Sequence, residues 1–129
     1  MIAKNITELI GNTPMIELKM KNNDWKVYLK LEKFNPGGSM KDRMALNMIN
    51  QAEKDGKLKP GGTIIESSSG NTAIGLAIAS AIKGYKFIAV VDHHASKEKI
   101  DMIKAYGGNI VVVGDGYKDN EVAVIEREK

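Results

Sequence analysis

The amino-acid sequence predicts an α/β fold, a three-layer open parallel sheet within one domain. Short apolar segments rich in Ile and Val alternate with longer segments of helical spacing from residue 63 to residue 113. Gly84 and Gly107 each stand where a helical segment stops, a common place for glycine. Strands that alternate with helices in this way form right-handed crossovers on a parallel sheet. At 129 residues, the chain has the length of one ordinary domain.

Two strands are predicted before residue 33. A Gly-Asn-Thr-Pro turn signal at residues 11–14 introduces a strand predicted over residues 13–20. Apolar and polar residues alternate over residues 26–32. This alternation predicts a second strand that is half-buried, with one face in the core.

A helix is predicted to follow, and then a regular alternation of elements. Methionines at positions 40, 44 and 48 repeat at helical spacing, and a stripe of this kind is expected in the core. Ser39 can cap this helix together with Asp42, and Gly56 ends it. The remaining elements are strands at residues 63–66, 86–91 and 110–113, helices at 72–82 and 96–106, and a last segment of helical composition at 120–129.

Composition argues against several classes of function. The chain has no cysteine, which excludes disulfides, thiolate metal sites and thiol nucleophiles. The net charge of +3 comes from lysines interleaved with acids, and aromatic residues are few, so nucleic-acid binding is not expected. No apolar segment is long enough to span a membrane, and the first residues do not show the charged and then apolar pattern expected of a secretory leader. The expected compartment is therefore the cytoplasm.

Residues 35–43, Asn-Pro-Gly-Gly-Ser-Met-Lys-Asp-Arg, form the first loop of chemical interest. Pro36, Gly37 and Gly38 make a bend whose backbone a ligand can approach closely. Lys41 then lies in the first turn of the following helix, where the helix dipole disfavours a positive charge. A neutral amine is what Schiff-base chemistry requires. An ordinary surface lysine is the plain alternative, and this loop alone does not decide between the two.

Residues 66–72, Glu-Ser-Ser-Ser-Gly-Asn-Thr, form a second loop between a predicted strand and a predicted helix. Ligands bind at this end of the strands in open parallel sheets. Free backbone N–H groups, hydroxyls and an amide would converge there on an anion, either a phosphate or a carboxylate. An ordinary helix cap needs only one such residue, so the composition of the loop favours an anion site.

Other chemical interpretations have less support. Ser39 and Lys41 are one residue closer together than the serine–lysine pair of hydrolases. His93 and His94 follow a strand, but adjacent side chains should point apart and no other histidine exists, so no metal site is predicted. No glycine-rich nucleotide-binding motif is present.

Taken together, the two loops resemble those of the cysteine synthase and cystathionine β-synthase family of pyridoxal-phosphate enzymes. The resemblance begins with Ile-Gly-Asn-Thr-Pro at residues 10–14 and continues through residues 35–43. It then includes Leu-Lys-Pro-Gly at residues 58–61, Ser-Gly-Asn-Thr at 69–72 and Lys-Ala-Tyr-Gly at 104–107. The fold that it implies is the amino-terminal part of the fold-type-II, tryptophan synthase β-like fold.

The resemblance also implies a cofactor, pyridoxal 5'-phosphate, and roles for individual residues. Lys41 would hold the cofactor as a Schiff base and remove the α-proton of the substrate. Asn71 would hydrogen-bond the phenolic oxygen of the cofactor. The α-carboxylate of an amino-acid substrate would be bound by the loop residues Ser68, Ser69, Gly70, Asn71 and Thr72.

The implied reaction is cysteine synthase-like β-replacement on an activated serine, O-acetylserine or O-phosphoserine, to make cysteine or a related amino acid. Met40, the Glu-Ser pair at residues 66–67 and residues 90–92 look more like the siderophore-pathway branch, which joins O-phosphoserine to glutamate. Cystathionine β-synthase activity is a further alternative. We therefore leave the nucleophile and the leaving group open.

Members of this family are roughly twice as long as this chain or more, on the scale of two domains. Residues 1–129 would then be the amino-terminal domain that carries the lysine, without the carboxy-terminal domain that binds the cofactor phosphate. Two alternatives from other classes are an inactive fragment that acts through a partner and a carboxylate-binding module. A sheet edge or face left uncovered predicts a homodimer or other self-association.

Overall fold

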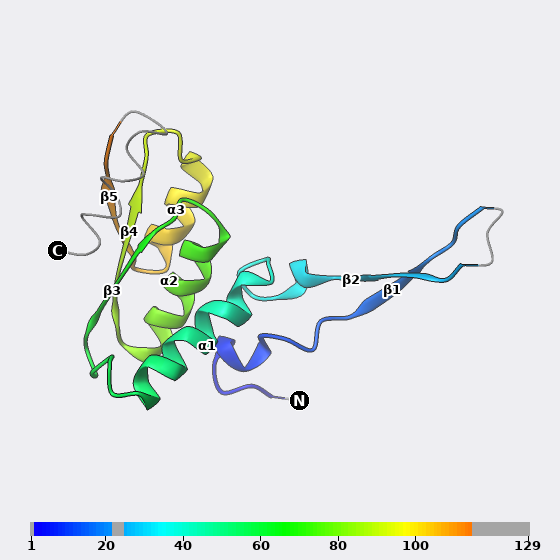
Figure 1. Cartoon of the computed structure of the whole chain (residues 1–129), viewed down its shortest axis with the longest axis horizontal. Coiled ribbons are helices and arrows are strands. Elements are labelled where there is room, and N and C mark those ends of the chain that lie inside the picture. Colours follow the sequence, from blue (N-terminus) through cyan, green and yellow to red (C-terminus); the bar gives the residue numbers. More distant parts are fainter. Residues whose placement is uncertain (1, 22–24, 115–129) are drawn as a thin grey trace.

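The structure consists of an α/β body and a two-stranded hairpin that projects from it (Figure 1). It is a computed structural model that describes residues 2–21 and 25–114. The segment of helical composition predicted at residues 120–129 lies outside the described residues. No helix within the described ranges has the length and apolar character needed to cross a membrane.

The body is built on a three-stranded parallel sheet in the order β3-β4-β5. Ser67 at the end of β3 is paired with Val90 of β4, so the carboxyl ends of these strands meet at one edge. The crossover helices α2 and α3 lie on the same side of the sheet (Figure 1). This arrangement confirms the predicted α/β class and the parallel sheet. The elements are β3 (Thr63–Ser67), α2 (Asn71–Lys83), β4 (Lys86–Val91), α3 (Lys97–Ala105) and β5 (Asn109–Val112).

Helix α2 lies at the centre of the core, and eight consecutive residues from Ala73 to Ser80 are buried. Small and apolar residues occur all around this helix, which is typical of a helix with neighbours on every side. Phe87 and Ala89 of β4 and Ile103 of α3 complete the same buried cluster.

Helix α1 (Lys41–Lys54) packs against α2 through small residues, so the expectation that its methionines form the core was wrong. Its buried positions are Asp42, Ala45 and Ile49, whereas Met40 and Met48 are 59% and 49% exposed. A Cβ placed on Gly75 of α2 would lie only 3.2 Å from the Cβ of Ala45. The helices approach so closely at this point that a methionine side chain would not fit between them.

The hairpin pairs β1 (Met15–Leu18) with β2 (Val27–Lys30) in antiparallel register. Both strands were predicted, but the expected burial of β2 was wrong, because every residue of the two strands is exposed. Residues that face each other across an antiparallel pair lie on the same face. One face of the hairpin is therefore entirely apolar, with Ile16 opposite Leu29 and Leu18 opposite Val27. Short 3-10 helices at Ile6–Leu9 and Glu32–Phe34 flank the hairpin in the chain.

Candidate active site

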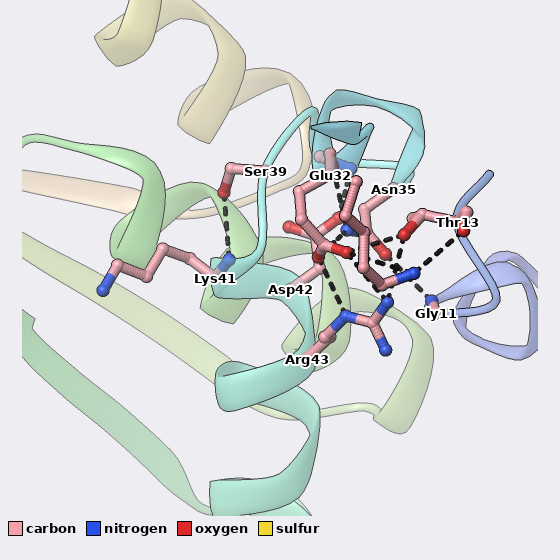
Figure 2. Close-up of polar contacts among 10 residues, drawn as sticks. Gly11, Thr13, Glu32, Asn35, Ser39, Lys41, Asp42 and Arg43 are labelled. Atoms are coloured by element: carbon pink, nitrogen blue, oxygen red, sulfur yellow. Dashed lines mark hydrogen bonds and ion pairs between the residues drawn. The ribbon is translucent and has the colours of Figure 1, made fainter. Parts of the chain in front are cut away.

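The loop of residues 36–40, here called the lysine loop, leads into α1, and Lys41 is the first residue of that helix. Within the loop, the Gly38 N–H donates to the Asn35 carbonyl at 2.8 Å, with Gly38 at a φ of +80° that favours glycine. The Lys41 N–H donates to Ser39 Oγ at 3.1 Å. Figure 2 shows the Lys41 side chain extending away from the neighbouring polar cluster. The predicted loop therefore presents a half-buried lysine at a helix start.

Asp42 holds the lysine loop through a buried hydrogen bond to its backbone. It does not cap the helix together with Ser39, as the sequence predicted. Its side chain is 1% exposed, and its Oδ2 accepts the Gly37 N–H. A side chain on residue 37 would collide with this carboxyl group, so only glycine fits there. Burial raises the pKa of Asp42 above its ordinary value of 3.8, although the hydrogen bond from Gly37 acts in the opposite direction.

Residues 66–72, here called the serine loop, connect the carboxyl end of β3 to the start of α2, as the sequence predicts. Ser68 Oγ accepts the Gly70 N–H at 3.2 Å, which turns the chain into the helix. Gly70 is the N-cap, so no side chain of the cap residue accepts a first-turn N–H of α2. Asn71 and Thr72 begin the helix, and Ser69 lies in the loop before them. Backbone N–H groups at such a helix start are suited to a carboxylate or phosphate.

Close packing of α1 on α2 brings the two loops to the same part of the molecule. A Cβ on Gly75 would lie 3.1 Å from the Lys41 carbonyl oxygen, so the first turn of α1 touches the second turn of α2. Asn71 is four residues before Gly75 and thus lies on the same side of α2. Lys41 and the start of α2 therefore lie in one region of the molecule, which is formed by the N-termini of α1 and α2.

A polar cluster around Glu32 lies beside the lysine loop and was not singled out from the sequence (Figure 2). The Glu32 carboxylate accepts hydrogen bonds from Arg43 Nε at 2.9 Å and Arg43 Nη2 at 3.0 Å. It also accepts from Thr13 Oγ1 at 2.6 Å and from Asn35 Nδ2 at 2.9 Å. The Arg43 guanidinium and the Thr13 hydroxyl lower the pKa of Glu32 from 4.5 to about 2. In the sequence, Glu32 is only one polar residue in an alternating segment, and no pattern marks partners 19 and 11 positions away.

The family of pyridoxal-phosphate dependent enzymes matches residues 6–129. The chain belongs to this family. Cysteine synthase of Staphylococcus aureus is 51% identical over 110 residues, which are 84% of this chain and 36% of the relative. The chain spans between 36% and 38% of the length of the first curated relatives that it matches.

Solved structures show the same fold. A hydrogen sulfide-producing enzyme from Fusobacterium nucleatum matches with a TM-score of 0.90 and 38% identity, over 100% of this chain and 44% of that one. O-ureido-L-serine synthase matches with a TM-score of 0.87 and 41% identity, over 98% of this chain and 42% of that one. The resemblance read from the sequence and its implied fold are thereby confirmed.

The residues of this pyridoxal-phosphate family chain fit the cofactor that the family uses. The cofactor is an anionic aldehyde, and the region holds a half-buried primary amine on Lys41 next to a helix start without a side-chain cap. Gly38 leaves room for a ligand, since a Cβ at this position would meet no atom within 4 Å. An amine for the aldehyde and N–H donors for an anion are the groups that such a ligand requires.

The two histidines after β4 differ from expectation in one respect. Their rings do not point apart, because their centroids are 3.8 Å apart. His93 Nδ1 lies 3.1 Å from the Gly114 carbonyl, which joins the ends of β4 and β5. In the described part of the chain, no group of three or more metal-ligating side chains is gathered.

Proposed function

We propose that this chain supplies the lysine part of a pyridoxal-phosphate site for β-replacement on an activated serine. The observation that supports the proposal is the contact of α1 with α2 at Gly75, where the first turn of α1 packs against the helix that follows the serine loop. Relatives support the same class, since those named above include a cysteine synthase and O-ureido-L-serine synthase. The full-length protein would be a cytoplasmic enzyme that acts on a small amino acid.

Within this site, the chain's own residues have distinct tasks. Lys41 Nζ would hold the cofactor and then act as the base that takes the α-proton of the substrate. Asn71 would donate to the phenolic oxygen of the cofactor. The cofactor, when bound, supplies an electron sink for the carbanion that loss of the proton creates.

The serine loop would orient the substrate through its carboxylate. Ser68, Ser69 and Thr72 carry hydroxyls, and Asn71 and Thr72 open α2 with N–H groups that can donate to a bound anion, while Gly70 forms the turn before them. Held in this way, the α-carbon would lie within reach of the lysine amine. We propose that the cofactor phosphate is bound by a carboxy-terminal domain, in the part of the relatives that this chain does not span.

The choice of nucleophile and leaving group is the finer part of the proposal. Cysteine synthesis from O-acetylserine or O-phosphoserine is the first choice, because a cysteine synthase is among the relatives. The alternatives are the siderophore-pathway reaction with glutamate and cystathionine synthesis with homocysteine. Sulfide, glutamate and homocysteine, offered in turn to the full-length protein with each activated serine, would select among them.

The test for this chain is its reaction with pyridoxal 5'-phosphate. We expect an absorbance near the visible edge on addition of the cofactor, and borohydride should fix the label on Lys41. Lys41→Ala should lose both, whereas Lys54→Ala, at the far end of α1, should keep both. If wild type and Lys41→Ala behave alike, the chain is an inactive fragment on its own.

The apolar face of the hairpin supports self-association as a second property. Ile16, Leu18, Val27 and Leu29 form one continuous exposed face. Exposed apolar faces of this kind commonly mark sites of association. We propose that a second copy of the chain covers this face in solution.

A further inference from the structure

The Asp42 carboxylate holds the inside of the lysine loop, and a second carboxylate, that of Glu32, holds the two ends of the segment that carries Lys41. Glu32 Oε2 accepts from Asn35 Nδ2 and from Arg43 Nε, both at 2.9 Å. Asn35 is the residue immediately before the loop, and Arg43 follows Lys41 by two positions. One oxygen atom therefore joins the two ends of the segment that carries the lysine.

The partners of this carboxylate are themselves fixed. Asn35 is 3% exposed, and its Oδ1 accepts the Gly11 N–H at 2.8 Å. The guanidinium of Arg43 lies against Gly11, where a Cβ would be 3.0 Å from Arg43 Nη1. Few alternative positions are open to either end of the loop, because each end has a second contact with the same backbone.

The same cluster connects the lysine loop to the base of the hairpin. Thr13, two residues before β1, donates to Glu32 Oε1, and the Leu31 N–H after β2 donates to the Pro14 carbonyl at 2.9 Å. Lys30 Nζ donates to the Thr13 carbonyl at 2.9 Å. The Glu32 carboxylate therefore holds both the base of the hairpin and the lysine loop.

We propose that Glu32 is a positioning residue, which sets the placement of Lys41 by bridging Asn35 and Arg43. This inference rests on the proposed function of Lys41, but the bridge itself can be measured without cofactor. Glu32 acts through the loop and does not touch the reacting atoms. Loss of the Glu32 carboxylate should make the lysine loop more mobile. The sheet and α2 should remain intact, because they are held by the buried core around α2.

Glu32→Gln tests the bridge, and Glu53→Gln is its matched control. Like Glu32, Glu53 carries a carboxylate that accepts side-chain hydrogen bonds, here from Lys83 at 2.8 Å and Tyr85 at 2.7 Å, but it lies near the other end of α1. Amide hydrogen exchange is the first measurement. We expect Gly37, Gly38 and Lys41 to exchange at least about 10-fold faster in Glu32→Gln, with β4 amides unchanged, and no change of these loop amides in Glu53→Gln.

The second measurement is the position of the pyridoxal phosphate label after borohydride trapping. The ratio of label on Lys41 to label on Lys54 should fall at least about 5-fold in Glu32→Gln and remain at the wild-type value in Glu53→Gln, because only the first change frees the loop. If β4 amides also accelerate in Glu32→Gln, Arg43→Lys replaces it. This variant keeps the positive charge but loses the bidentate contact with Glu32. Amide exchange should then become faster in the lysine loop but not in β4.

The outcomes separate the inference from the proposed function. Unchanged loop exchange in Glu32→Gln, or faster exchange with an unchanged label ratio, overturns the positioning role. A wild-type chain that labels Lys41 no more than Lys54 overturns the proposed role of Lys41. In that case, exchange alone decides whether Glu32 holds the loop.

Discussion

The α/β body and the β1–β2 hairpin are built from similar apolar residues, yet they keep them in opposite environments. Ile49 of the body is 2% exposed, whereas Ile16 of the hairpin is 49% exposed. The body encloses its own core around α2, while the apolar face of the hairpin has no cover among the described residues. Strand and helix patterns therefore decide local structure in both regions, but burial depends on what packs against each element.

The strongest test of this contrast substitutes the same residue type in each region. Ile49→Ala should lower the free energy of unfolding by about 2–5 kcal/mol, because it leaves a cavity between α1 and α2. Ile16→Ala should change it by less than about 1 kcal/mol, because half of that side chain already meets water. Urea unfolding followed by circular dichroism measures both. Equal losses would show that the hairpin is as well packed as the body.

A second test addresses the close contact that builds the site within the body. Gly75→Val should lower the free energy of unfolding by about 1–3 kcal/mol, since the new side chain meets backbone atoms of Lys41 and Asp42. The control Ile82→Val, on the exposed side of the same helix, should stay within about 0.5 kcal/mol of wild type.

Gly75→Val should also weaken pyridoxal phosphate labelling of Lys41, because α1 must move away from α2. Peptide mass spectrometry after borohydride treatment measures the label. A variant that is as stable and as reactive as wild type would contradict the role of this contact in assembling the site.

The accuracy of the sequence predictions follows the same division. Strand β4 begins and ends where the sequence predicts, at Lys86 and Val91, and its parallel pairing followed from the alternation of elements. The prediction that the methionines are buried was wrong, because helical spacing indicates an apolar side of α1 but does not indicate which side packs against α2. Gly75 in the middle of a helix was the overlooked signal of close packing. Glu32 bonds to Thr13 and Arg43, which lie 19 and 11 positions away in the chain, so only the fold could reveal these contacts.

Two carboxyl groups, Glu32 at the hairpin base and Asp42 inside the body, have pKa values that are shifted in opposite directions. Hydrogen bonds from Arg43 and Thr13 lower the pKa of Glu32 from 4.5 to about 2. Its contribution to stability is therefore present above pH 4.5 and is lost as the pH falls toward 2. Burial raises the pKa of Asp42 above 3.8, so wild type should lose stability from this group as the pH rises through the raised pKa.

Unfolding free energies of wild type, Glu32→Gln and Asp42→Asn across this acid range give the measurement. The advantage of wild type over Glu32→Gln should shrink as the pH falls below 4.5. The balance between wild type and Asp42→Asn should instead shift toward Asp42→Asn as the pH rises. Parallel curves for all three proteins would contradict both assignments.

The smallest effect on stability is expected at the apolar face of the hairpin, where we propose that a second copy of the chain binds. Leu29→Lys places a charge in the middle of the apolar face, opposite Ile16, and at an exposed position the free energy of unfolding should change by less than about 0.5 kcal/mol. Burying that charge in an interface would be unfavourable, so sedimentation should show a shift toward monomer. Tyr28→Lys changes the neighbouring residue on the opposite face of β2 and should leave association as it is. If both variants associate like wild type, contacts elsewhere hold the copies together, and the apolar face of the hairpin is not where they meet.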